Sequence, residues 1–152
     1  MKRLIDALQP GTRVFVPGLS GESALLHDEL RADPERSRGV TFIGVHFPGI
    51  DRIDYLSLDP TVRQTAFFMS PSVRSGMAAG RADLLSLDYP GIVRHLSAMP
   101  PVDVAMAQLT PPDRDGWCSA GLASDFKPLV WTLAKRRVAH LNPRLPCTRR
   151  CR

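Results

Sequence analysis

Short apolar runs recur along the chain and are separated by segments with helical spacing. Five of the runs are almost continuously apolar, which is typical of strands that are covered on both faces of a sheet. A sixth and weaker run spans Leu84–Leu87. The pattern therefore predicts a sheet of short buried strands. The five stronger runs are Arg13–Pro17, Val40–Phe47, Ala66–Met69, Val102–Thr110 and Val138–Asn142.

The segments between these runs predict four helices. In the first, Leu26 and Leu30 stand one turn apart on a single face. Proline in the first turn of the third helix and basic residues at the end of the fourth are both favourable positions. The predicted helices span residues 21–33, 72–82, 90–99 and 125–137. The candidate N-caps are Ser20 for the first, Asp88 for the third, and Ser124 or Asp125 for the fourth.

Strands that alternate with helices imply βαβ units with right-handed crossovers. We therefore predict an α/β fold, with an open, mostly parallel sheet and helices on both faces in Rossmann-like layers. The length of 152 residues corresponds to one domain, and no internal repeat or low-complexity linker divides it. In such a sheet, ligands bind outside the carboxyl ends of the strands.

Four loops rich in glycine, proline and serine follow the carboxyl ends of the predicted strands. Such loops let backbone amides approach a ligand closely, and the helix N-termini after two of them favour a phosphate, a carboxylate or a developing oxyanion. For any single loop, the alternative is that its Gly and Pro residues only make turns. Four such loops at one edge favour a ligand site. In chain order they read PGLSGES, HFPGID, SPSVRSG and TPPDRDGWCSAG.

Common catalytic and nucleotide-binding motifs are missing from the sequence. It has no G-x-S-x-G elbow, P-loop or G-x-G-x-x-G fingerprint. Cys118 lies in the longest loop, but no histidine can be assigned to it as a base, so we interpret it as a structural thiol. His46 either faces the site or packs as a core or loop histidine. Cys147 and Cys151 form a CxxxC pair that lacks the further ligands of a zinc site, so we expect no metal.

Composition and charge indicate whether a membrane or a nucleic acid is an expected binding partner. The hydrophobic content of 43% and charged content of 23% are ordinary for a soluble globular protein, and no apolar run approaches the roughly 18 residues of a membrane helix. Four arginines in residues 144–152 carry most of the net charge of +5, which leaves one net positive charge on residues 1–143. Nucleic-acid binding through this tail is the weaker alternative. We expect neither a nucleic acid nor a membrane as partner.

The N-terminal residues and the number of cysteines indicate in which cellular compartment the protein is found. The first eleven residues, MKRLIDALQPG, contain no apolar signal region. Three cysteines, an odd number, argue against a disulfide framework and for a reducing compartment. We therefore expect the protein in the cytoplasm.

Three longer stretches carry a resemblance to a known family. FFMSPSVRSGMAAGRADLL contains S-P-x-x-R before a short helix, and VDVAMAQLTPPDRDGWCSAGLASDF is a strand followed by P-P-D-x-x-G-W-x-S-x-G. With VAHLNPRLP, they resemble the N-terminal half of the acetyl-CoA hydrolase/transferase family, in particular the 4-hydroxybutyrate and acetate CoA-transferases. We therefore predict a CoA-transferase N-terminal domain over residues 1–146 and a basic Arg/Cys tail, expected to be disordered, over residues 147–152.

The resemblance implies transfer of coenzyme A between carboxylic acids, as in acetate metabolism, through a glutamate that attacks the acyl-CoA thioester. In the family this glutamate lies in the second half. This chain has only Glu22, Glu29 and Glu35, which we interpret as helix charges, Glu22 as a complement to the dipole of the first helix. We therefore expect no catalytic residue here and only half of an active site. The chain is then a truncated or frame-shifted product, or a natural short subunit.

The resemblance also implies which residues form the walls of that site. Arg74 is the best candidate to meet a carboxylate or a phosphate. The expected substrates are an acyl-CoA and a small carboxylate, with no permanently bound cofactor, and the expected partner is the missing C-terminal half or a second copy. The alternatives are a non-catalytic remnant, a CoA-binding module, or half of an acyl-CoA hydrolase. The predicted substrate- and CoA-binding residues are Gly18, Ser20, Ser70, Ser72, Arg74, Asp113, Gly116 and Ser119.

Overall fold

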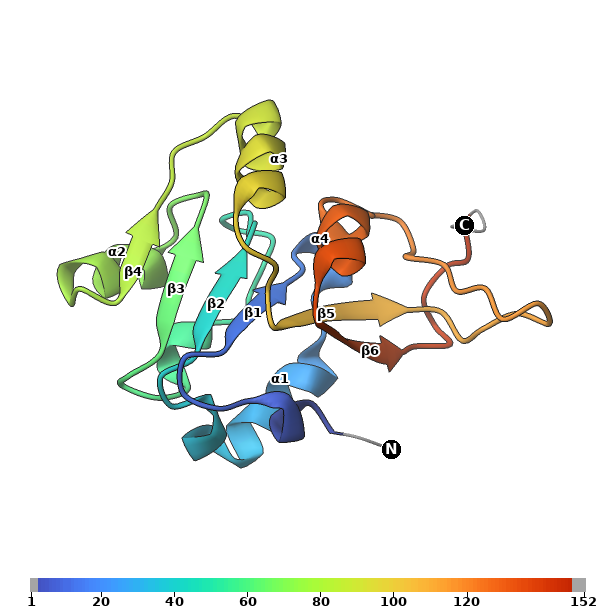
Figure 1. The fold of residues 1–152 in the computed structure, drawn as a ribbon, viewed down its shortest axis with the longest axis horizontal. Coiled ribbons are helices and arrows are strands. Elements are labelled where there is room, and N and C mark those ends of the chain that lie inside the picture. The colour runs from blue at the N-terminus through green and yellow to red at the C-terminus, as the bar shows by residue number, and fades with distance from the viewer. Residues whose placement is uncertain (1–2, 149–152) are drawn as a thin grey trace.

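The computed structural model describes residues 3–148, and its centre is a six-stranded sheet in which every strand pair is parallel (Figure 1). The predicted α/β fold with a parallel sheet is confirmed. The strands are β1 (Arg13–Val16), β2 (Thr41–Gly44), β3 (Arg63–Ala66), β4 (Ala82–Leu84), β5 (Val104–Leu109) and β6 (Arg136–Leu141). The helices are α1 (Ala24–Ala32), α2 (Pro71–Ala78), α3 (Tyr89–Ala98) and α4 (Lys127–Leu133), and the 3-10 turns are η1 (Leu4–Ala7), η2 (Leu19–Gly21), η3 (Pro34–Ser37) and η4 (Tyr55–Ser57).

Helices cover both faces of the sheet, because successive side chains of a strand point to opposite faces. Val14 and Val16 of β1 belong to the core cluster that includes Leu26 of α1 and Val73 of α2. Phe15, between them, belongs to a second cluster that includes residues of α3 and α4. Figure 1 shows α1 on one side of the sheet and α3 with α4 on the other. Complete burial of one such side chain stabilises the fold by about 1.5–3 kcal/mol.

The strand order reverses next to β1. The order is β4-β3-β2-β1-β5-β6, so the chain moves outward from β1 to β4 and then crosses back to place β5 on the other side of β1. In open α/β sheets the ligand crevice lies at such a reversal, outside the carboxyl ends of the strands. The loops after β1 and β5 meet at this point.

Three predicted strands begin later in the chain than those in the structure, among them Val138–Asn142, which is observed as β6 from Arg136 to Leu141. The strand predicted over Ala66–Met69 is observed at Arg63–Ala66, and the run Leu84–Leu87 begins where β4 ends. β3 alternates exposed Arg63 with buried Gln64, so it lacks a continuous apolar run. Of the apolar residues that follow it, Phe67 and Phe68 are loop residues that pack on the α3 and α4 side, and Met69 packs on the other side.

The first helix begins later than predicted. Ser23, not Ser20, is the N-cap of α1, because its Oγ accepts a hydrogen bond from the backbone N–H of Leu26 at 3.2 Å. Ser20 lies in η2 instead, and its Oγ accepts a hydrogen bond from the backbone N–H of Ala123 at 3.0 Å. The serine thus joins the loop after β1 to the loop after β5.

The remaining caps follow the prediction only in part. Asp88 caps α3 as predicted, accepting from the N–H of Gly91 at 2.8 Å. α4 has no side-chain cap, so the prediction of Ser124 or Asp125 in that role is wrong, and the backbone carbonyl of Ser124 accepts from the N–H of Lys127 instead. The basic residues expected at the end of this helix lie beyond it. Arg137 of β6 still donates to the carbonyls of Trp131 and Thr132 in its last turn.

The described residues contain neither a helix that could span a membrane nor a cluster of metal-binding side chains. No helix within residues 3–148 is long and apolar enough to cross a membrane. In the same range, no group of three or more His, Cys, Asp or Glu side chains is placed to hold a metal ion.

Candidate functional site

The carboxylate of Asp51 joins the loops that follow β1 and β2. It accepts hydrogen bonds from the backbone N–H of Leu19 at 2.6 Å and from that of Phe47 at 2.5 Å. Leu19 has a φ of 52°, a left-handed conformation that costs roughly 1–2 kcal/mol in a residue with a Cβ. The two hydrogen bonds hold this conformation. Asp51 was not predicted as a site residue.

A second carboxylate connects the same two loops. The side chain of Glu22 accepts hydrogen bonds from the backbone N–H of Ile53 at 2.9 Å and from that of Arg52 at 3.1 Å. The prediction that Glu22 complements the dipole of α1 is wrong, because the first turn of α1 contains no acidic residue. Glu22 precedes the helix and serves the neighbouring loop.

Gln108, near the end of β5, ties the loops on the other side of the reversal. Its Nε2 donates to the carbonyl of Ser20 at 3.0 Å, and its Oε1 accepts from Nδ2 of Asn142 at 3.0 Å. Neither Gln108 nor Asn142 was predicted as a site residue. The sequence could have indicated Gln108, because it is a polar residue near the end of an otherwise apolar strand.

The long loop after β5 is an ordered hairpin. At its base, Thr110 and Ser119 pair through their backbones at 2.9 Å. At its tip, the carboxylate of Asp113 accepts from the backbone N–H groups of Asp115 and Trp117, both at 2.9 Å, and Gly116 has a φ of 82°. Glycine suits that position because a left-handed backbone carries no steric cost without a Cβ. Asp113 and Gly116 thus have a structural role in the turn.

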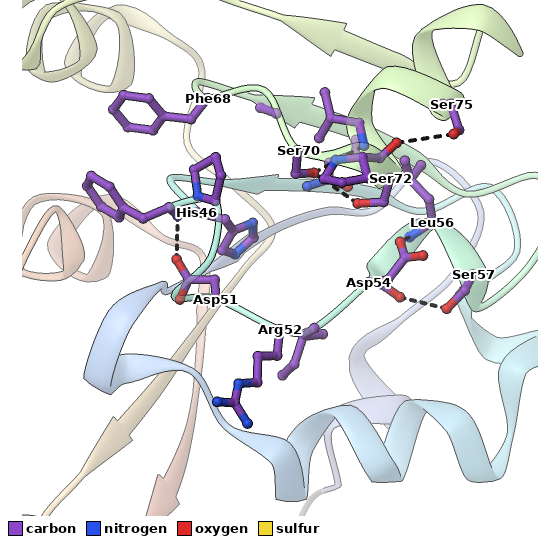
Figure 2. Close-up of a pocket in the computed structure, with 18 of the residues that line it drawn as sticks. His46, Asp51, Arg52, Asp54, Leu56, Ser57, Phe68, Ser70, Ser72 and Ser75 are labelled. Carbon is purple, nitrogen blue, oxygen red and sulfur yellow. Dashed lines mark hydrogen bonds between the residues drawn. The ribbon is translucent and has the colours of Figure 1, made fainter.

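A cavity of about 650 Å³ lies between the loop after β2 and the start of α2 (Figure 2). Ser70 is the N-cap of α2 and accepts from the N–H of Val73 at 3.2 Å. The hydroxyl groups of Ser70 and Ser72 are 3.0 Å apart. A helix N-terminus lined by hydroxyl groups favours an anionic or polar ligand group. Other lining residues are His46, Asp51, Arg52, Asp54, Gln64, Phe68 and Arg81.

His46 lies in the wall of this cavity and stacks on Tyr55, with the ring centroids 5.7 Å apart. Its Nε2 is buried and finds no hydrogen-bond partner among the described residues. Gly44 leaves the space for the ring, since a Cβ there would lie 2.5 Å from Cε1 of His46. Burial lowers the pKa of His46, although nearby Asp51 acts in the opposite direction. His46 is therefore a neutral imidazole at pH 7.

The eight predicted site residues do not share one pocket. Ser70 and Ser72 line the larger cavity, and Gly18 and Ser20 lie at the strand reversal beside Asp51. Asp113 and Ser119 line a smaller cavity of about 240 Å³ at the hairpin after β5. The remaining two lie outside both linings: Arg74 is exposed on α2, and Gly116 is exposed at the hairpin tip.

The histidines on either side of Tyr55 predict a pH-dependent stability. Burial lowers the pKa of His27 as it does that of His46, so the unfolded chain binds protons at a higher pH than the folded one. The stability that the neutral histidines contribute is therefore fully present above about pH 6.5, and the free energy of unfolding decreases as the pH falls below that value. For each histidine, the decrease is about 1.4 kcal/mol per unit of difference between its pKa in the unfolded and folded states. Urea midpoints at pH 7.5 and 5.5 measure the effect.

Replacing both His27 and His46 with glutamine is the matched control for this dependence. The double variant should show a smaller difference between the two midpoints than the unaltered chain. An equal difference in both proteins would show that other groups carry the pH dependence.

The sheet, the strand reversal and the loops that meet there define an α/β domain with a parallel sheet. Residues 2–150 match the sequence profile of the acetyl-CoA hydrolase/transferase N-terminal domain. The chain belongs to this family, and the predicted resemblance is confirmed.

Similar proteins are longer than this chain. It is 27% identical over 147 residues to a succinyl-CoA:acetate/propanoyl-CoA:succinate CoA transferase of Fasciola hepatica, covering 93% of this chain and 30% of that protein. It is 25% identical over 152 residues to a 4-hydroxybutyrate coenzyme A transferase of Clostridium kluyveri, covering 97% of this chain and 34% of that one. The chain thus spans about a third of the length of these curated relatives.

Solved structures share the fold. RipA from Yersinia pestis superposes with a TM-score of 0.77 at 17% identity, over 95% of this chain and 37% of that one. A 4-hydroxybutyrate CoA-transferase from Porphyromonas gingivalis gives a TM-score of 0.62 at 18% identity, over 95% of this chain and 32% of that one. At these identities the likeness shows a common fold.

Proposed function

We propose that this domain forms one wall of an active site that transfers coenzyme A between an acyl-CoA and a small carboxylic acid. Membership of the acetyl-CoA hydrolase/transferase family over residues 2–150 carries this proposal. The geometry supports it, because three loops meet at the strand reversal and a cavity with serine hydroxyl groups adjoins them. The odd number of cysteines supports a cytoplasmic location.

The nucleophile of this reaction comes from residues outside this chain. No glutamate lines the cavity described above. Glu22 is engaged with the loop after β2, and Glu29 accepts from the N–H of Ile5 at 3.2 Å and pairs with Arg3 at 3.5 Å. Glu35 lies in η3, which leads into the N-terminal end of β2, whereas the cavity follows the C-terminal end of that strand. In the proposed reaction, a carboxylate from the rest of the protein attacks the thioester carbonyl, forms an acyl anhydride and releases CoA as the thiolate.

The residues of this chain bind and orient the reactants. The hydroxyl groups of Ser70 and Ser72 at the start of α2 are suited to the carboxylate of the small acid. Arg74, exposed one turn into α2, is suited to a phosphate of CoA as the substrate approaches. Gly18 and Leu19 hold the loop after β1 against Asp51 in the cavity wall, and Ser20 joins this loop to the loop after β5. Ser119 lies in the separate cavity at the hairpin. Binding of the long CoA molecule then holds the reacting end in place.

Incubation of the chain with acetyl-CoA tests the assignment of the nucleophile. We expect an unchanged intact mass and no turnover, because no carboxylate of a glutamate is placed at the cavity. A covalent CoA or acetyl adduct on any of the three glutamates would contradict the proposal. Calorimetric titration with CoA distinguishes the alternatives: measurable binding supports a CoA-transferase wall or a CoA-binding module, and no binding supports a non-catalytic remnant.

A further inference from the structure

The hairpin after β5 contacts the last described residues of the chain. The backbone N–H of Thr148 donates to Oγ of Ser119 at 3.3 Å, and Oγ1 of Thr148 donates to the carbonyl of Gly121 at 3.0 Å. Leu145 packs beside Gly121, where a Cβ would lie 2.8 Å from Cγ of Leu145. Figure 1 shows the two segments at the same end of the molecule. The start of the predicted tail, residues 147 and 148, is therefore placed by contacts, and residues 149–152 lie outside the described part.

These contacts bring two cysteines to one place. Cys118 directly precedes Ser119, and Cys147 directly precedes Thr148, so the hydrogen-bonded pair holds the two cysteine backbones near each other. Both cysteines line the cavity of about 240 Å³. Both are free thiols, Cys147 is exposed and Cys118 is partly exposed. Soluble reagents therefore have access to both thiols.

The segment that carries Cys147 begins with a turn after β6. Between Asn142 and Thr148, its backbone is held by a turn in which Leu145 donates to the carbonyl of Asn142 at 3.1 Å, and by the bond from Arg144 to Oδ1 of Asn142 at 2.9 Å. Cys118 lies at the base of an ordered hairpin. Two accessible thiols that line one cavity are the arrangement that thiol–disulfide exchange requires.

We propose that Cys118 and Cys147 form a reversible disulfide that fastens the C-terminal segment to the hairpin after β5. In the first step the thiolate of Cys147 attacks a low-molecular-weight disulfide such as glutathione disulfide, which gives a mixed disulfide and releases one glutathione thiol. The thiolate of Cys118 then attacks the sulfur of Cys147 and releases the second glutathione. Two protein thiols are oxidised to one disulfide, and one glutathione disulfide is reduced to two thiols. A reducing thiol pool reverses both steps.

The pairing is argued from the two cysteines and their contacts, so it does not depend on the proposed transfer of CoA. Its effect falls on the hairpin that carries Asp113, Gly116 and Ser119. The disulfide would close a long chain loop and restrict the unfolded state, so we expect the melting temperature to rise by about 5–10 °C on oxidation and to return on reduction.

Peptide mapping after oxidation tests the pairing. The chain is equilibrated with glutathione disulfide, free thiols are alkylated, and the protein is digested with trypsin without reduction. Cleavage after Arg114, Arg144, Arg149 and Arg150 places the three cysteines in separate peptides. We expect a cross-linked peptide that contains Cys118 and Cys147, and one alkylated thiol, that of Cys151.

Three variants make the outcome decisive. Cys118→Ser and Cys147→Ser should each abolish the cross-link and the shift in melting temperature, and Cys151→Ser, the matched control, should keep both. A cross-link between Cys147 and Cys151 would overturn the proposal. Three alkylated thiols, or glutathione adducts without a cross-link, would overturn it as well.

Discussion

Replacing Gly18 with alanine will lower the free energy of unfolding by about 3 kcal/mol, at the upper end of the range for overpacking. A Cβ at this position would lie 2.3 Å from the carbonyl oxygen of Val45, a backbone atom that has no rotamer to move into. It would also lie 3.0 Å from Oδ2 of Asp51. The loop after β1 must then separate from β2, and the bond from Leu19 to Asp51 is lost. Urea denaturation monitored by tryptophan fluorescence measures the change.

Gly116→Ala is the matched control. Gly116 has a φ of 82°, but a Cβ there would meet no atom within 4 Å. Only the strain of the left-handed backbone applies, which costs about 1–2 kcal/mol. Equal losses of stability in the two variants would contradict the close approach of the loop after β1 to β2.

The second large effect is expected for Asp51→Asn, which should lower the free energy of unfolding by about 2–3 kcal/mol. The carboxylate accepts two backbone N–H groups, one from each loop. An amide of the same shape keeps one acceptor and turns its own NH2 toward the other donor. Hydrogen exchange at the amides of Leu19 and Phe47 should become faster, and this readout separates the loss of the loop anchor from a general loss of stability.

Asp28→Asn provides the comparison for that variant. The carboxylate of Asp28 is mostly exposed and pairs with Arg31 at 3.9 Å on the surface of α1. Exposed pairs of this kind contribute about 0.2–1 kcal/mol. A loss from Asp51→Asn that is no larger than that from Asp28→Asn would show that Asp51 does not hold the two loops.

Both residues matter for the proposed function because they fix the edge of the sheet where the substrate would bind. A site that positions a thioester against a carboxylate loses rate when its loops are displaced by as little as about 1 Å. Gly18 allows the close approach of the two loops, and Asp51 fastens it. We therefore expect either variant, in the complete protein, to impair transfer of CoA.

The sequence predicts the sheet well because its central strands are buried on both faces. β1, β2 and β5 read as continuous apolar runs, and each is observed within the predicted bounds. β3 is an exception, since Gln64 and Thr65 give it a polar pattern. Its place is fixed by parallel pairing with β2 and β4, and pairing between distant segments leaves no local signal.

The candidate site could be predicted only in part. Loops rich in serine and glycine are visible in the sequence, and Ser70 and Ser72 do line the cavity. Asp51, Glu22 and Gln108 are different, because their roles depend on partners that lie 30 residues or more away in the chain. A carboxylate that binds backbone N–H groups of a distant loop looks like any surface aspartate or glutamate in the sequence. Only the fold brings the two loops together.

Activity in a fusion tests the proposed function most directly. The chain would replace the matching first third of the 4-hydroxybutyrate coenzyme A transferase of Clostridium kluyveri, to which it is 25% identical. Transfer of CoA from acetyl-CoA to 4-hydroxybutyrate is then measured, with the Gly18→Ala fusion as the control that should be impaired. We expect the fusion to transfer CoA. A fusion that folds and binds CoA but shows no transfer would contradict the proposal that this domain forms a wall of a CoA-transferase active site.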